Sequence, residues 1–140
     1  MNRISTITLL AIASAATCTG AIAQQPGLKA DVPFAFSVGD TWMPAGEYTI
    51  SQPTREVLEL RAGDHFALVV SSQSNQESNA GSELVFDRYG DQYFLRRVLC
   101  PKVSSLNLEI AQSKAEKRAR KNAIEAKAYV NGEQTVIAAR

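Results

Sequence analysis

The amino-acid sequence predicts a mainly β protein with one helix near its C-terminal end. Apolar residues fall on every second position between 28 and 38, which is typical of a half-buried strand. A two-residue turn signal divides the strand-like run 83–99, and residues 114–127 are rich in strong helix formers. We therefore expect a single antiparallel β-barrel or sandwich of about six to seven strands, then a basic C-terminal α-helix and a short terminal strand or hairpin.

The first 23 residues have the pattern of a secretory signal peptide. Arg3 gives a positive start, residues 4–16 are uncharged and largely apolar, and Ala21-Ile22-Ala23 offers small residues for cleavage. The sequence thus predicts export to the periplasm, the outer envelope or the medium after cleavage near Ala23. An uncleaved membrane anchor and a lipoprotein processed at Cys18 are the alternatives.

Residues 24–112 read as an antiparallel β-domain. Pro33 stands on the outward phase of the first run, which favours an edge position or a bulge. Pro44-Ala45-Gly46 fits a type I turn, and a second turn surrounds Ala62-Gly63-Asp64. The patterns predict strands over 28–38, 47–51, 57–61 and 65–70, and a solvated loop over 71–82.

Residues 83–99 predict a hairpin with a primed turn at Gly90-Asp91. In that register Phe86 faces Leu95, and Arg88 faces Tyr93 as either a cation–π or a packing pair. The opposite side carries further large apolar groups, namely Val85, Tyr89, Phe94 and Val98. Because both faces are apolar, a helix, a second sheet or a partner chain must cover the second one.

Residues 113–140 predict a helix and a terminal strand packed on the β-domain. Ser113 fits an N-cap, with Glu116 reaching back to complete a capping box. The apolar stripe of the helix is thin and consists mainly of alanines at every fourth position. Asn131-Gly132 further along favours a terminal hairpin, with a single added strand as the alternative.

The charge is divided unevenly along the chain. Residues 24–99 carry six basic and ten acidic side chains, a net charge of −4, whereas residues 100–140 carry eight and four, a net charge of +4. The cations of the predicted helix form a candidate docking surface: Lys114, Lys117, Arg118, Arg120 and Lys121. We rank docking on the chain's own acidic segment first, and an anionic membrane surface or polyanion second. Nucleic acid is not expected for an exported protein.

Removal of the signal peptide would leave Cys100 as the only cysteine, so no disulfide could form within the chain. Cys100 follows a predicted strand and precedes Pro101, which favours burial as a small apolar residue. The second hypothesis is an intermolecular bridge through this thiol. Such a bridge would make a homo-oligomer or join the protein to an envelope protein.

Three segments together resemble a family of small uncharacterised secreted bacterial proteins. The segments are PFAFSVGDTWMPAGEY (33–48), LVFDRYGDQYFL (84–95) and SKAE (113–116). Members share a signal peptide, a P-F-x-F-x-V-G…P-A-G-x-Y pattern, a R-Y-G-x-x-Y-F-L hairpin and an S-x-A-E helix start. The resemblance implies a fold and an exported location, and it brings no catalytic residues.

The sequence shows no recognisable catalytic constellation. His65 is the only histidine, and a structural zinc site needs about four nitrogen or sulfur ligands. A hydrolase using His65 is the least favoured hypothesis, because no G-x-S-x-G elbow accompanies it. We expect no cofactor and no metal. The expected function is a non-enzymatic structural or binding module, and the alternative is a small β-barrel carrier of an apolar ligand.

Overall fold

A computed structural model describes residues 27–103, 106–126 and 133–140 of the chain. The predicted signal peptide, Cys18 and the Asn131-Gly132 turn lie outside these residues. The elements are β1 Leu28–Val32, β2 Phe36–Val38, β3 Thr41–Met43, β4 Gly46–Thr54, β5 Val57–Ala62, β6 His65–Gln73, β7 Ser82–Tyr89, β8 Gln92–Leu99, β9 Leu108–Ile110, α1 Lys114–Glu125 and β10 Gln134–Ala139.

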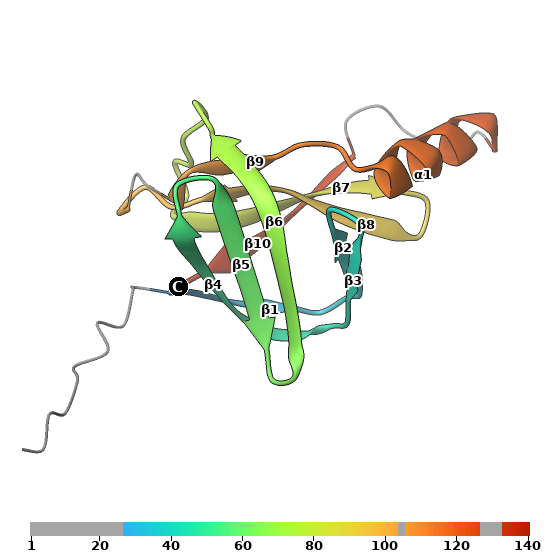
Figure 1. Cartoon of the computed structure of the whole chain (residues 1–140). Helices are drawn as coiled ribbons and strands as arrows, with labels where there is room; N and C mark the ends of the chain where they lie inside the picture. The colour runs from blue at the N-terminus through green and yellow to red at the C-terminus, as the bar shows by residue number, and fades with distance from the viewer. Residues whose placement is uncertain (1–26, 104–105, 127–132) are drawn as a thin grey trace, which may run out of the picture.

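Eight of the strands close into an antiparallel barrel (Figure 1). The wall runs β8-β7-β10-β1-β4-β5-β6-β9 and returns to β8 through the β8–β9 pairing. The structure confirms the mainly β class, the barrel and the C-terminal helix. The predicted number of strands was slightly too small, because the short strands β2, β3 and β9 carry only three residues each and give little periodic signal.

The last strand of the sequence lies inside the wall, between β7 and β1. β10 pairs with β7 along its whole length, from Gln134↔Asp87 to Ala139↔Ser82. Its pairing with β1 is much shorter, with one register pair and two backbone hydrogen bonds of 2.8 Å between Lys29 and Arg140. The terminal segment therefore supplies part of the barrel wall and is not an addition to its outside.

The predicted strand 28–38 is broken at Pro33, where the chain leaves the barrel wall. β2 then pairs in parallel with β8 at Ser37↔Phe94 and antiparallel with β3. The β2–β3 hairpin contacts β6 on its other side, beside the part of β6 that β9 does not reach. The alternation still holds across the break, because Val32, Phe36 and Val38 are all buried.

Two further local predictions need correction. The chain bends at Pro44-Ala45 without a hydrogen-bonded turn, and the buried Tyr48 hydroxyl donates a hydrogen bond to the Pro44 carbonyl oxygen instead. The loop predicted over 71–82 is shorter, because β6 continues to Gln73 by pairing with β9. Its polar residues at 71–73 were mistaken for loop residues, although Ser71 is buried.

The interior of the barrel is filled by side chains. The largest fully buried residues come from six of the wall strands and from the β2–β3 hairpin: Tyr48, Phe36, Phe86, Met43, Ile50, Leu58, Leu60, Leu84, Leu108, Val32, Val38 and Val98. Phe36 meets Tyr48 and Phe86 edge to face, with ring centroids 5.2 and 5.1 Å apart. This packed core gives the outer surface a rigid support.

Candidate functional site on the docked helix

The β7–β8 hairpin follows the predicted register only near its turn. Phe86 faces Leu95 and Arg88 faces Tyr93, with the Arg88 guanidinium carbon 5.5 Å from the ring centroid, which is cation–π geometry. Between Val85 and Phe86 the register shifts by one residue, which leaves Arg96 as an extra residue in β8. Beyond this bulge Val98 pairs with Leu84 and belongs to the core, so its predicted place on the second face was wrong.

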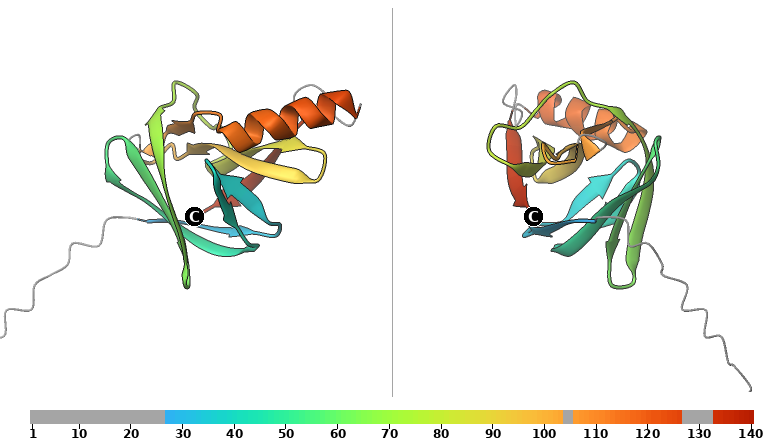
Figure 2. Two further views of the ribbon diagram at one scale, coloured as in Figure 1. Left: turned by 45° about the vertical axis from the view of Figure 1, so that its right-hand side comes forward. Right: turned by 90° about the vertical axis from the view of Figure 1, so that its left-hand side faces the viewer.

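Helix α1 covers the second face of the hairpin (Figure 2). Tyr89 and Phe94 project from this face and form a separate small cluster with Ala119 and Ala123 of the helix. Small side chains let the helix axis lie close to the sheet, although they bury little apolar area. The predicted need for a cover is met by the chain's own helix.

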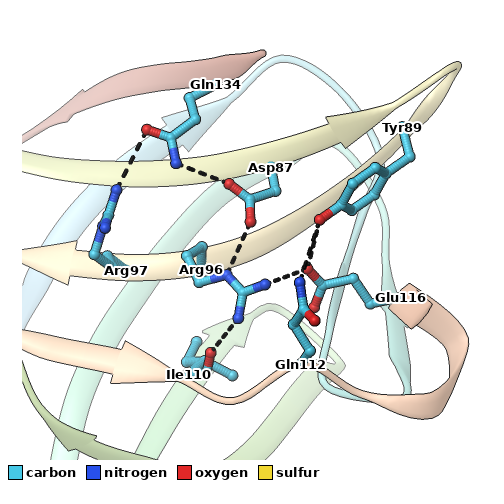
Figure 3. A network of polar contacts seen from close by, with 8 residues as sticks. All are labelled: Asp87, Tyr89, Arg96, Arg97, Ile110, Gln112, Glu116 and Gln134. Carbon is cyan, nitrogen blue, oxygen red and sulfur yellow. Dashed lines mark hydrogen bonds and ion pairs between the residues drawn. The ribbon is translucent and has the colours of Figure 1, made fainter. Parts of the chain in front are cut away.

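A buried polar network joins the helix to the sheet (Figure 3). From its bulge position, Arg96 donates through Nε to Asp87 at 2.9 Å and through Nη1 to the Ile110 carbonyl at 2.9 Å. Its Nη2 forms an ion pair with Glu116 of the helix, to which the Tyr89 hydroxyl also donates at 3.1 Å. The side chains of Arg96 and Glu116 are only 11% and 5% exposed. Solvent therefore screens this pair weakly.

The helix cap explains why Glu116 faces the sheet. Ser113 is the N-cap, and its hydroxyl oxygen accepts from the Glu116 backbone N–H at 3.1 Å. The Glu116 carboxylate also accepts from the Ser113 backbone N–H, which is the reciprocal half of the predicted capping box, and it contacts Arg96 and Tyr89 as well. Asp40, at the tip of the β2–β3 hairpin, accepts from the Ala115 N–H at 3.3 Å, which ties that hairpin to the helix start.

The network shifts the ionisation of its members. Burial raises the pKa of the Glu116 carboxyl, and the nearby Arg96 opposes this only in part. The pKa of Tyr89 is raised to about 12, first by burial and then by the carboxylates of Glu116 and Asp87. Burial alone would lower the pKa of Arg96, but the two carboxylates outweigh it and the guanidinium stays charged.

We expect Tyr89→Phe to make the free energy of unfolding less dependent on pH in alkali. The pKa of Tyr89 in the folded protein is above its ordinary value of 10, so the neutral tyrosine stabilises the fold fully below pH 10. This stabilisation is lost as the pH rises toward 12. The wild-type free energy of unfolding should fall in that window by up to about 1.4 kcal/mol per pH unit more than that of the variant. Urea unfolding measured across this range tests the difference, and parallel pH curves for the two proteins would contradict it.

The five predicted docking cations of the helix do not dock it. Lys114, Lys117, Arg118, Arg120 and Lys121 are all exposed. Among the described residues, these five cations form one ion pair, between Lys121 and Glu125 of the same helix at 3.9 Å. The helix instead binds the sheet through an acid and two alanines, so the basic helix does meet the β-domain, but with its opposite face. The net charge of each segment could not reveal this, because charge sums contain no direction.

Sequence reasoning missed Arg96, and it assigned Glu116 to the helix cap without its contact to the sheet. One signal was present: the strict hairpin register would place Arg97 opposite Leu84, facing the core. A charged side chain at that position indicates that the register must shift. The shift keeps Arg97 on the outer side, where its guanidinium donates to Gln134 at 3.3 Å.

Cys100 and His65 lie at opposite ends of the barrel. His65 is exposed and starts β6 directly after the β5–β6 turn, whereas Cys100 follows the end of β8, next to the start of β7. Cys100 is buried, with 4% exposure, and its sulfur accepts from the Ser82 hydroxyl at 3.3 Å. The described residues contain no cluster of three or more His, Cys, Asp or Glu that could hold a metal ion.

Comparisons with family models, curated proteins and solved structures gave no match. The family resemblance of the three sequence segments therefore stays a prediction. Within the described residues, α1 is too short and too polar to cross a bilayer.

Proposed function

We propose that this protein is an exported, non-enzymatic binding module whose helix α1 presents a cationic surface to an anionic partner. The single observation that carries the proposal is the orientation of α1. Its docking contacts use Glu116, Ala119 and Ala123, and all five cations of its N-terminal two turns remain exposed. A helix needed only as a cover for the sheet would not require this concentration of positive charge.

The outer face of the helix also has a defined shape. A shallow groove of about 470 Å³ runs along it, lined by Lys117, Arg120, Lys121 and Ile124 together with Gln112 and Glu125. Ile124 is 52% exposed among the cations. Basic side chains next to an exposed apolar one favour a surface of anionic headgroups, where the cations attract and the apolar residue inserts.

The barrel structure favours a binding module over the two other candidate functions, a carrier of an apolar ligand and a hydrolase that uses His65. Its interior is filled by aromatic and aliphatic side chains, which leaves the scaffold rigid and weighs against a ligand held at the barrel centre. A hydrolase based on His65 would need a nucleophile near that ring, and Cys100 lies at the other end of the barrel. The positions of these residues favour a binding role.

The proposal is tested with the exported protein, recovered from the envelope or medium and sequenced at its N-terminus. It should begin near residue 24 and bind vesicles that contain phosphatidylglycerol, with weaker binding at high salt. Each cation near an anionic surface contributes about 1 kcal/mol, so the triple substitution Lys117→Glu, Arg120→Glu, Lys121→Glu should weaken binding by roughly a hundredfold or more. Co-sedimentation measures both proteins.

A matched control reverses three exposed cations of the barrel, Lys29, Arg55 and Arg61, and makes the same change in net charge. It should bind vesicles nearly as well as the wild type. Equal losses in both triple variants would show that only net charge matters and would contradict a helix site. Binding to soluble polyphosphate, with none to vesicles, would replace the membrane surface by a polyanion as the partner.

A further inference from the structure

A second site lies at the end of the barrel opposite to His65. β1 and β7 begin at this end, and β8 and β10 finish there. Two backbone hydrogen bonds hold the described residues that follow β8 at this end: the Val103 N–H donates to the Cys100 carbonyl at 3.0 Å, and the Leu106 N–H donates to the Val103 carbonyl at 2.8 Å. This end of the barrel has a pocket of about 390 Å³.

The floor of the pocket is formed by core residues. Leu28, Cys100 and Leu106 line it, and each is at most 5% exposed and belongs to the main hydrophobic cluster. Hydrogen bonds hold this floor in place, because the Cys100 N–H donates to the Asn107 side-chain oxygen at 2.7 Å and the Ser82 hydroxyl donates to the Cys100 sulfur. An apolar group that enters the pocket would therefore contact a surface that is already formed.

The charged side chains at this pocket have one sign. Lys102 and Arg140 line it and are exposed, and none of the described lining residues is an acid. The remaining lining residues are small or apolar: Gly27, Ala80, Gly81, Ser82, Val103, Ala138 and Ala139. A ligand with an apolar chain and an anionic head would match both features, with its chain on the core residues and its head at the two cations.

We propose that this barrel-end pocket binds a small anionic amphiphile of the medium-chain carboxylate type. The site is separate from the outer face of the helix, and it uses the mouth of the barrel and not its filled centre. It does not depend on the function proposed above. The apolar floor would select the chain of the ligand, and Lys102 and Arg140, which form no ion pair within the described residues, would select its anionic head.

Decanoate is the probe for the test, and titration calorimetry with the exported protein measures its binding. Ala80→Trp, in the loop before β7, should fill the pocket and abolish detectable binding. Val136→Trp, at an exposed position of β10 that does not line the pocket, is the control and should bind as the wild type does. Lys102→Glu should weaken decanoate binding about tenfold, the loss of one charge-assisted hydrogen bond, while binding of the neutral decanol is unchanged.

Modification of Cys100 by a thiol reagent locates the bound molecule. Saturating decanoate should slow this reaction at least severalfold in the wild type and leave it unchanged in Ala80→Trp. The proposal is overturned if Ala80→Trp and Val136→Trp bind decanoate equally, if decyltrimethylammonium binds as tightly as decanoate, or if decanoate does not protect Cys100. Vesicle binding by Ala80→Trp should stay at the wild-type level, so a failure here is distinct from a failure of the helix site.

Discussion

Deletion of residues 134–140 is expected to abolish the folded barrel. These residues form β10, which pairs with β7 along its length and meets β1 at Ala30↔Ala139. Their removal would leave two neighbouring edges unpaired and would expose the core that Ile137 and Ala139 help to cover. Since domains are stable by only about 5–15 kcal/mol, the loss of one wall strand should remove cooperative unfolding entirely. Circular dichroism during heating and size-exclusion chromatography measure the result.

A substitution in the same strand provides the control. Val136 is 51% exposed, so Val136→Thr should keep the wild-type fold and change the free energy of unfolding by no more than about 0.5 kcal/mol. A truncated chain that stays monomeric and unfolds cooperatively would contradict the prediction. Truncation before Ser113 cannot be used to isolate the role of the helix, because it removes β10 as well.

Arg96→Met is expected to cost about 3–5 kcal/mol of unfolding free energy, the usual loss when one partner of a buried ion pair is removed. The substitution leaves two carboxylates, those of Asp87 and Glu116, without their cation in a poorly solvated site beside Tyr89. Methionine has a similar length, so packing of the side-chain stem should change little. Urea unfolding at neutral pH measures the loss.

Arg61→Met is the matched control, because the Arg61–Glu59 pair is exposed, with 62% and 23% of the two side chains accessible. Surface pairs of this kind contribute about 0–1 kcal/mol. The prediction fails if the two variants lose the same amount of stability. The double variant Arg96→Met, Glu116→Gln should lose less unfolding free energy than the sum of the two single losses, because Glu116→Gln removes one of the uncompensated charges.

Periodicity predicted those parts of the fold in which neighbours in sequence decide the structure. The hairpin turn at Gly90-Asp91, the inward phase of residues 28–38 and the Ser113 cap all follow from local patterns. The place of β10 could not be predicted in this way, because its alternation is compatible with any free sheet edge. The break at Pro33 was visible as a proline, but a proline alone does not show where the chain goes next.

The candidate site was predicted only in part, for a related reason. The cluster of cations on 114–121 is evident in the sequence, and the structure places all five on the exposed side of the helix. Which face would dock depended on a single partner, Arg96, whose direction is set by a one-residue bulge on another element. Such long-range pairing leaves no periodic trace at either position.

The meeting of β1 and β10 also fixes when folding can finish. The pair Ala30↔Ala139 joins residues near the two limits of the described chain, so the closing contact spans nearly all of the described residues. Contacts of such long sequence separation form late and slowly, because a large loop must be ordered before they contribute. No closed barrel can exist before β10 has been synthesised. A chain destined for passage through a membrane would thus have no finished native state to resist its translocation.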